Sequence, residues 1–430
     1  MINRNILADD FGISQDVIFL FKKAENDIKT MFDYIDEIVE YNQYKVLFNM
    51  QKNKLSDIHF NGTTGYGYDD IGRDTIEKIF AGIFGAEDAL VRSQIVSGTH
   101  AIALCLFSNL RPGDELIFAC GEPYDTLKEI IGDNVKSEGS LMDYGISYKK
   151  ISLQGNGKID MEALLSSITN ATKMVMIQRS KGYDYRQSLF INDINEAIIN
   201  IKNRNKNIIV FVDNCYGEFT EFNEPTEVGA DLIAGSLIKN AGGGIAPTGG
   251  YVIGKKELVE KAAYKLYAPG IGKRVGPTLG VNRLILQGLF LAPDIVGNAL
   301  KGSILISRVM ELLGYEVLPK YNNKRTDIVQ AVKFNDKNEL ITFIQGIQEG
   351  SPVDSFVAPE PWDMPGYEDK VIMAAGGFIQ GSSIELSADA PIRKPYIAYI
   401  QGGLSYSQIK LSIMIAVNNM IKKGYVKLNV

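Results

Sequence analysis

The sequence predicts an α/β fold with a large, mainly parallel sheet and a smaller C-terminal α+β domain. From residue 89 to about residue 250, short apolar runs alternate with helical patterns, which is typical of βαβ units with helices on both faces of a sheet. Residues 281–313 are strongly apolar with a helical period, and residues 314–430 mix strand-like with helix-like stretches. A chain of 430 residues is also too long for one simple core. We therefore expect three parts: an N-terminal helical extension over 1–60, a large domain over 61–295 and a small domain over 296–430.

The individual elements follow from apolar spacing, taken in chain order. Residues 15–55 have a near-helical spacing of apolar side chains, residues 62–72 form a glycine-rich aromatic loop, and residues 74–84 are helix-like before Gly85. The strands expected in the large domain are 89–96, 115–119, 173–178, 208–213, 232–234 and 250–253. The strands expected in the small domain are 315–318 and 328–332, and its helices are 339–348 and 406–422.

Composition excludes several classes of function. The net charge of −6 and the scattered basic residues argue against nucleic-acid binding. No apolar stretch approaches the roughly 18 uncharged residues of a membrane helix, and the N-terminus has no apolar signal core. Three cysteines, all in apolar stretches, suit reduced thiols in a cytoplasmic protein. No His/Cys/Asp cluster has the spacing of metal ligands, so we predict no metal site.

Lys239 and Asp213 are the two residues that indicate a chemistry. Asp213 ends one apolar strand, and Lys239 lies just past the next strand and before Gly242-Gly243-Gly244, which lets backbone pack close to a ligand. Pyridoxal phosphate (PLP) enzymes use this layout, with a lysine that forms the Schiff base and an acid that pairs with the pyridine nitrogen. A solvated loop lysine and a helix-capping acid remain the simpler alternatives for each residue alone. Together they predict a PLP enzyme acting on amino acids.

A phosphate site and a ring-stacking residue are expected at the same edge of the sheet. Ser97, Gly98 and Thr99 form a small-residue turn between a strand and a helix, where free N–H groups and the helix dipole favour a phosphate. Ser236 could add a hydroxyl. Tyr124 follows another strand and could stack on a flat cofactor ring. Many strand–helix turns look alike, and a packed surface tyrosine is equally compatible with position 124.

These motifs, in this order, resemble the cystathionine/methionine lyase family of PLP enzymes of Cys/Met metabolism. The motifs that carry the resemblance are Ser97-Gly98-Thr99-His100-Ala101-Ile102, Tyr124-Asp125-Thr126, Asp213-Asn214-Cys215-Tyr216 and Ser236-Leu237-Ile238-Lys239. The likeness is closer to a divergent branch, the methionine gamma-lyase-like or aluminium-resistance proteins. The signs of this branch are residues 65–68, 239–244 and 395–403. The resemblance covers the chain from about residue 60.

The resemblance implies a fold type I, aspartate-aminotransferase-like structure and dimers that pair into a homotetramer. It implies that Lys239 is the Schiff-base lysine, Asp213 the pyridinium partner and Tyr124 the ring stacker. Ser97, Gly98, Thr99 and Ser236 would hold the phosphate.

Relatives also lend a tyrosine and an arginine from the neighbouring subunit to this phosphate. The candidates here are Tyr66, Tyr68 and Arg73, although their spacing departs from the family's Tyr-x-Arg. The family's Ser-x-Thr-Lys has become Ser236-Leu237-Ile238-Lys239, which loses one hydroxyl. For the arginine that binds the substrate carboxylate, Arg393 is the first candidate and Arg179 the second.

The favoured hypothesis is a PLP-dependent lyase that eliminates a thiol from a sulfur-containing amino acid and gives a 2-oxo acid and ammonia. Lys239 would act as the base at Cα, with its pKa lowered by desolvation and a nearby cationic imine. Tyr68 or Tyr124 would protonate the leaving sulfur. The alternative within PLP chemistry is a γ-replacement synthase or an aminotransferase. A non-catalytic binding protein that kept the fold is the alternative from another class. No G-x-G-x-x-G opens a helix after the first strand, which argues against a dinucleotide site.

Overall fold

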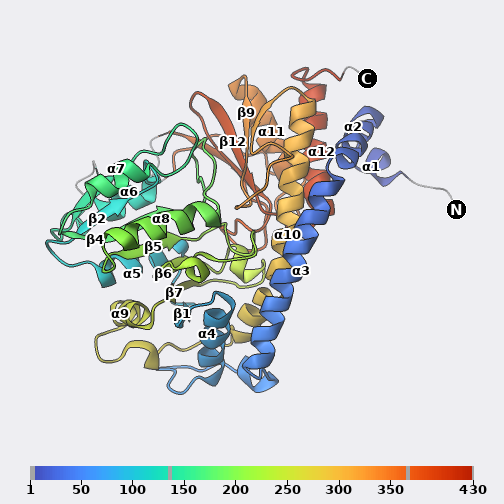
Figure 1. Ribbon diagram of the computed structural model, residues 1–430. Helices are drawn as coiled ribbons and strands as arrows, with labels where there is room; N and C mark the ends of the chain where they lie inside the picture. The colour runs from blue at the N-terminus through green and yellow to red at the C-terminus, as the bar shows by residue number, and fades with distance from the viewer. Residues whose placement is uncertain (1–4, 134–137, 365–368, 429–430) are drawn as a thin grey trace. The chain divides into compact units, whose positions relative to one another are not determined.

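The chain folds into two compact units in its computed structural model, which describes residues 5–133, 138–364 and 369–428 (Figure 1). The sheet unit comprises Glu40–Pro293, and the terminal unit combines Met1–Val39 with Asp294–Val430. The boundary between the units falls inside two long helices, α3 (Lys29–Lys52) and α10 (Asn282–Leu312). The division into an extension, a PLP-binding domain and a small domain stays a prediction.

The sheet unit is built on a seven-stranded sheet in the order β1-β7-β6-β5-β4-β2-β3. Its strands are β1 (Asp88–Arg92), β2 (Glu115–Phe118), β3 (Ser147–Lys150), β4 (Thr172–Gln178), β5 (Ile209–Asp213), β6 (Leu232–Ser236) and β7 (Gly250–Gly254). β3, β2, β4, β5 and β6 pair in parallel, and β7 runs antiparallel to both β6 and β1. The expected mainly parallel sheet is therefore confirmed. β4, β5 and β6 are buried almost throughout, as a sheet covered on both faces requires.

Helices cover both faces of this sheet. The helices of the unit are α4 (Ile71–Ile83), α5 (Gly98–Asn109), α6 (Asp125–Ile131), α7 (Met161–Ser167), α8 (Ile191–Arg204) and α9 (Lys256–Leu266). Its short 3₁₀ turns are η1 (Asp57–Phe60), η2 (Pro225–Val228), η3 (Asn240–Gly242) and η4 (Gly272–Arg274). Parallel crossovers are right-handed, so α5 and α6, which lead toward β3, lie on one face. α7 and α8 lead back toward β5 and lie on the other, where Figure 1 shows α8 over β4 and β5.

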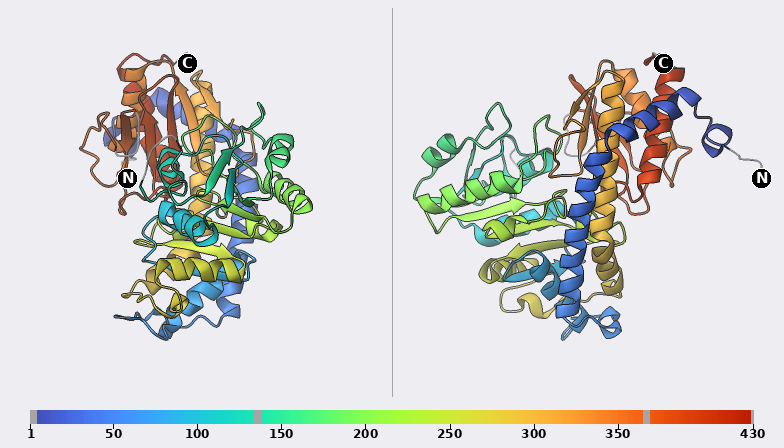
Figure 2. Two further views of the ribbon diagram at one scale, coloured as in Figure 1. Left: turned by 90° about the vertical axis from the view of Figure 1, so that its left-hand side faces the viewer. Right: turned by 45° about the vertical axis from the view of Figure 1, so that its right-hand side comes forward.

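The terminal unit contains a five-stranded antiparallel sheet in the order β10-β11-β12-β9-β8. Its strands are β8 (Glu316–Leu318), β9 (Gln330–Phe334), β10 (Val371–Ala374), β11 (Ser387–Pro391) and β12 (Tyr396–Gln401). Its helices are α1 (Ile6–Asp9), α2 (Gln15–Asp27), α11 (Lys337–Glu349) and α12 (Tyr406–Lys422). α11 packs on the sheet and α12 packs on α11 (Figure 2).

Most predicted elements coincide with observed ones. The predicted final helix over 406–422 is α12, and the apolar segment 281–313 is α10. β3 was not predicted, because its sequence, Ser-Tyr-Lys-Lys, has no apolar run and its residues are partly exposed at the sheet edge. β10, β11 and β12 were also not predicted.

Among the residues that the structure describes, one helix is long and apolar enough to span a membrane. The helix is α10, and 67% of its most apolar 18-residue window is buried inside the protein. Burial of this extent is typical of the core helix of a globular protein, so we interpret α10 as a core helix.

Replacing Gly346 by alanine tests the close packing of α11 on α12. A Cβ on Gly346 would lie 2.4 Å from the Cα of Ala416, which is backbone and cannot give way cheaply. Helix propensity alone would favour Gly346→Ala by about 1 kcal/mol. We expect overpacking to reverse the sign and to lower the free energy of unfolding by about 1–3 kcal/mol, measured by denaturant titration. Gly155→Ala, which meets nothing within 4 Å, should change it by less than about 0.5 kcal/mol. Stabilisation by Gly346→Ala would contradict the observed packing.

Candidate active site

The candidate site lies at the carboxyl edge of the parallel strands. Parallel strands end at the same edge of a sheet, which is where ligands bind in open α/β folds. Asp213 is the last residue of β5, and Lys239 follows β6 after two residues. Tyr124 caps α6 after β2, and Gly98 begins α5 after β1. The fold therefore brings together residues that are far apart in the sequence.

Lys239 lies at the centre of this cluster. Its Nζ sits 4.0 Å from the centroid of the Tyr216 ring, which is the geometry of a cation–π contact. The side chains of Asp213, Cys215 and Tyr124 are also close enough to interact electrostatically with the amine. The amine thus has an aromatic face on one side and a carboxylate nearby.

The sequence-based expectation of a lowered Lys239 pKa concerned an amine beside a cationic imine, and it stays a prediction. Burial does lower the pKa of the Lys239 amine. The neighbouring Cys215, Tyr216, Asp213 and Tyr124 side chains outweigh burial and hold the pKa well above its ordinary value. These neighbours therefore favour the charged form of the free amine.

Asp213 is a buried acid with few hydrogen bonds from neighbouring groups. It is 5% exposed, and one carboxylate oxygen (Oδ1) accepts a hydrogen bond from the backbone N–H of Cys215 at 3.1 Å. Burial raises the pKa of Asp213, while the Lys239 amine and the hydrogen bonds from Cys215 oppose that rise. A cationic group beside this carboxylate would be favoured, because it would relieve the cost of the buried charge.

The turn at the start of α5 closes tightly around Gly98. A Cβ at this position would lie 3.1 Å from Cys215 Sγ and 3.5 Å from Ser236 Cβ, so position 98 needs a small residue. The Ser97 hydroxyl caps α5 by accepting a hydrogen bond from the backbone N–H of His100 at 3.0 Å. Thr99 interacts through its hydroxyl with the Tyr124 phenol. The turn, Ser236 and Tyr124 therefore converge on the Lys239 cluster.

Tyr66, Tyr68 and Arg73 form a separate group. The two tyrosine rings stack on each other with centroids 5.5 Å apart, and they are 70% and 59% exposed. The Arg73 guanidinium is buried, and it donates to the Gly67 carbonyl at 2.6 Å and the Gly276 carbonyl at 3.2 Å. Among the described residues, no recorded contact joins this group to Lys239. Its role at a phosphate stays a prediction.

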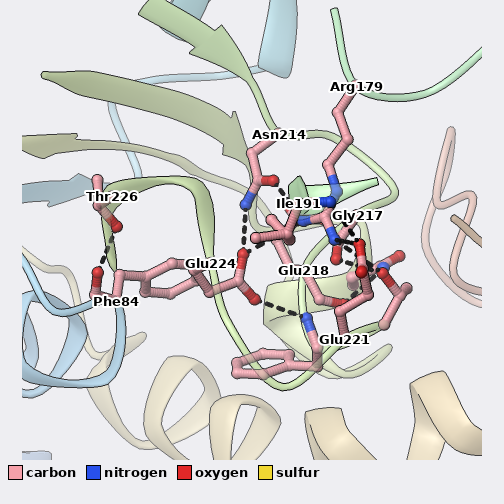
Figure 3. A network of polar contacts seen from close by, with 12 residues as sticks. Phe84, Arg179, Ile191, Asn214, Gly217, Glu218, Glu221, Glu224 and Thr226 are labelled. Atoms are coloured by element: carbon pink, nitrogen blue, oxygen red, sulfur yellow. Dashed lines mark hydrogen bonds and ion pairs between the residues drawn. The ribbon is translucent and has the colours of Figure 1, made fainter. Parts of the chain in front are cut away.

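Arg179 follows β4 and is fully buried in a polar network (Figure 3). Its guanidinium donates to Asn214 Oδ1 at 2.9 Å and to Thr220 Oγ1 at 3.2 Å. It also forms ion pairs with Glu221 at 3.0 Å and Glu224 at 3.4 Å. These bonds favour a structural role, which is to hold the loop after β5.

Arg393, in the terminal unit, is 53% exposed and pairs with Asp369 at 3.0 Å. A role of Arg393 or Arg179 in binding a substrate carboxylate stays a prediction.

Sequence reasoning assigned no role to Tyr216, Glu218 or Tyr251. Glu218 is fully buried, and its Oε1 accepts a hydrogen bond from the Tyr251 hydroxyl at 2.6 Å. The segment after Lys239 is also bonded to this loop. The side-chain amide of Asn240 donates a hydrogen bond to the backbone carbonyl of Glu218 at 3.0 Å. A signal was present in the sequence, since acids at 218, 221 and 224 after a buried strand are unusual.

The donor set fits PLP better than a metal ion. A lysine amine, a buried carboxylate, an aromatic side chain and a helix N-terminus with nearby hydroxyls match what PLP requires of a protein. Within residues 5–133, 138–364 and 369–428, no group of three or more His, Cys, Asp or Glu side chains has the arrangement of a metal site.

A known protein family, a known protein and solved structures are similar to this chain. A family model described as methionine gamma-lyase matches residues 17–421. The uncharacterized protein YnbB of Bacillus subtilis is 53% identical over 402 residues, which span 93% of this chain and 96% of that protein. A crystal structure of a carbon-sulfur lyase involved in aluminum resistance from Clostridium novyi NT is 52% identical, with a TM-score of 0.94 over 98% of this chain and 99% of that one. The PLP-dependent protein YhfS of Escherichia coli shares the fold, with a TM-score of 0.58 and 16% identity over 89% of this chain and 96% of that one.

Arg179→Met tests the buried network. The substitution leaves the buried carboxylate of Glu224 without its cation, and removing one partner of a buried pair costs about 3–5 kcal/mol. We expect a loss of that size in the free energy of unfolding, measured by denaturant titration. The matched control is Arg393→Met, because an exposed pair such as Arg393–Asp369 contributes at most about 1 kcal/mol. Equal losses in the two variants would contradict the network's role.

Glu218→Gln tests the buried acid through the pH dependence of stability. Burial, with a smaller effect of Glu224, raises the pKa of Glu218 to about 8 against the hydrogen bond from Tyr251. Between the ordinary carboxyl pKa and about 8, the folded state binds more protons than the unfolded state. The free energy of unfolding of the wild type should therefore fall as pH rises, by up to about 1.4 kcal/mol per unit. Glu218→Gln has no carboxyl to titrate at this position. Its stability relative to wild type should therefore rise from pH 5 to pH 8 and level off above pH 8.

The control for this titration is Glu129→Gln, at an exposed position on α6. Its difference from wild type gives the pH dependence that follows from removing an exposed carboxyl. A Glu218→Gln difference with no stronger pH dependence than this control would show that the Glu218 carboxyl is ionised in the folded protein.

Proposed function

The chain belongs to the methionine gamma-lyase family, as the resemblance predicted, and we propose that it is a PLP-dependent carbon–sulfur lyase. In this proposal it eliminates a thiol from a sulfur-containing amino acid and gives a 2-oxo acid and ammonia. The observation that carries the proposal is the convergence of Lys239, Asp213 and Tyr124 at the carboxyl edge of the sheet. Family membership supports the reaction class, and the site supports the cofactor.

The residues that would hold PLP follow from their chemistry. We propose that Lys239 binds the cofactor covalently through its amine, that Asp213 pairs with the pyridine nitrogen and that Tyr124 stacks on the ring. The turn of Ser97, Gly98 and Thr99 would bind the phosphate at the N-terminus of α5, with Ser236 beside it. Tyr66, Tyr68 and Arg73 would complete a phosphate site across a subunit interface. When bound, PLP supplies an electron sink for the negative charge that develops at Cα.

Proton transfers are assigned to Lys239 and to a tyrosine. The Lys239 amine, in its uncharged form, takes the proton from Cα of the substrate. Tyr124 or Tyr68 then donates a proton to the leaving sulfur. The pKa of the Tyr124 phenol is raised well above its ordinary value by burial and by Asp213. The phenol is therefore protonated at neutral pH, which is the state that a general acid needs.

The substrate carboxylate is assigned to Arg393 in preference to Arg179. An exposed ion pair such as Arg393–Asp369 contributes little to stability and can exchange its anion at small cost. The Arg179 guanidinium already interacts with Asn214, Thr220, Glu221 and Glu224 in a buried network. Redirecting Arg179 to a substrate would leave buried acids without a cation.

The assembly, domain layout and location are proposed from the family. We expect dimers that pair into a homotetramer in the cytoplasm, with residues 61–295 as the PLP-binding domain and 296–430 as the small domain. The substrate would be a small amino acid, with no nucleic acid or membrane as partner.

Product analysis with four amino acids tests the proposed function. The full-length protein, incubated with PLP and then supplied with methionine, homocysteine, cysteine or cystathionine, should release a 2-oxo acid and ammonia in equal amounts without an added acceptor. Lys239→Ala should reduce this release by at least about 10³-fold, because both the covalent anchor and the base are lost. It should also lose the borohydride-reducible adduct with PLP.

The other outcomes separate the alternatives. Product that forms only when a 2-oxo acid acceptor is added would indicate an aminotransferase, and product that forms only with a second thiol would indicate a γ-replacement synthase. A protein that stays colourless with PLP would be a non-catalytic member of the fold.

A further inference from the structure

Tyr216 has a backbone conformation that is costly for its residue type. Its φ is +71°, in the left-handed region that non-glycine residues seldom adopt. The turn around it is tight, because the Gly217 N–H donates to the Asn214 carbonyl at 3.0 Å and a Cβ on Gly217 would lie 2.4 Å from Arg179 Cδ. Strain of this kind persists only where the surrounding structure imposes it, and it concentrates at functional sites.

The strained turn places an aromatic face under the amine of Lys239. The Lys239 Nζ lies 4.0 Å from the Tyr216 ring centroid, well inside the range of about 6 Å for cation–π attraction. Phe219 in the same loop also has a positive φ, +63°, and the contact with Lys239 is what distinguishes Tyr216. The contact and the strain are separate observations, and both involve Tyr216.

We propose that Tyr216 is a positioning residue whose ring face binds the ammonium group of Lys239 whenever that lysine is not attached to the cofactor. The inference rests on the proposed function, in which Lys239 is the reacting residue. The ring keeps the released lysine beside Cα of the substrate rather than letting it move into solvent. It also favours the charged amine, and so influences when Lys239 gives up its proton.

Several titratable groups share this environment and have to be separated from the ring. Asp213 on β5, Cys215 and Glu218 on the loop after β5, and Tyr124 at the start of α6 also interact electrostatically with Lys239. Tyr216 adds both a ring and a phenol. Tyr216→Phe removes only the phenol, whereas Tyr216→Leu removes the π face at a similar backbone cost.

The test measures the reactivity of the Lys239 amine and not the activity of the loaded enzyme. The full-length protein, stripped of PLP, is labelled with acetic anhydride at a series of pH values, and modification of the Lys239 peptide is quantified by mass spectrometry. We expect Tyr216→Leu to lower the apparent pKa of the amine, with labelling about 10-fold faster at a fixed pH below that pKa. Tyr216→Phe should stay within about 2-fold of wild type. Tyr264→Leu, at an exposed tyrosine elsewhere in the sheet unit, should match wild type.

Two outcomes would overturn the proposal. Unchanged labelling in Tyr216→Leu would show that the ring does not bind the amine, and equal effects of Phe and Leu would assign the effect to the phenol. If Tyr216→Leu does not fold, replacing Tyr216 by 3,4,5-trifluorophenylalanine keeps the shape and weakens the negative ring face, with Tyr216→Phe as its reference. Faster labelling of the fluorinated protein supports the proposal, and no change refutes it.

Failure of this inference can be distinguished from failure of the proposed function. Binding of PLP is followed separately by its absorbance and by borohydride trapping at Lys239. If PLP is trapped there and the labelling of Lys239 is insensitive to the ring, only the role of Tyr216 is wrong. If labelling depends on the ring and PLP is not trapped, the proposed function fails.

Discussion

Three carboxyl groups are buried at the end of β5 and in the loop that follows it, and the arrangement of the site depends on how their charge is accommodated. A buried carboxylate is costly unless a cation or hydrogen-bond donors are close. Glu224 is paired with Arg179, and Asp213 faces Lys239. Glu218 receives a hydrogen bond from Tyr251, and its pKa is raised to about 8. Each acid therefore determines the position of a partner from another strand or loop.

These partners tie the loop after β5 to its neighbours on both sides. Arg179 comes from the end of β4, and Tyr251 comes from β7. The Asn240 amide links the segment after β6 to the Glu218 carbonyl. The backbone of the loop is consequently held in a shape that includes the unfavourable φ of Tyr216. The same bonds that offset the buried charge orient the groups around the Lys239 amine.

The expected lowered pKa of Lys239 illustrates why the order of the motifs along the chain is not enough. Burial lowers an amine pKa, and the sequence-based expectation combined burial with a cationic imine beside Lys239. The structure adds Asp213 and the ring of Tyr216, and both favour the charged amine. Whether a lysine acts as a base depends on this balance, which requires the positions of side chains from separate elements.

Local sequence determined the elements whose apolar pattern is strong, and these include the strands that carry Asp213 and precede Lys239. It also indicated the family, because the motifs around Ser97, Tyr124, Asp213 and Lys239 occur in a fixed order. It did not predict β3, where the strand is polar and lies at the sheet edge. Strand direction was decided by tertiary structure alone, since β7 is antiparallel although its apolar run resembles those of its parallel neighbours. The buried network of Arg179 and the contact between Tyr216 and Lys239 were likewise decided by packing, because no local pattern specifies which distant side chains meet.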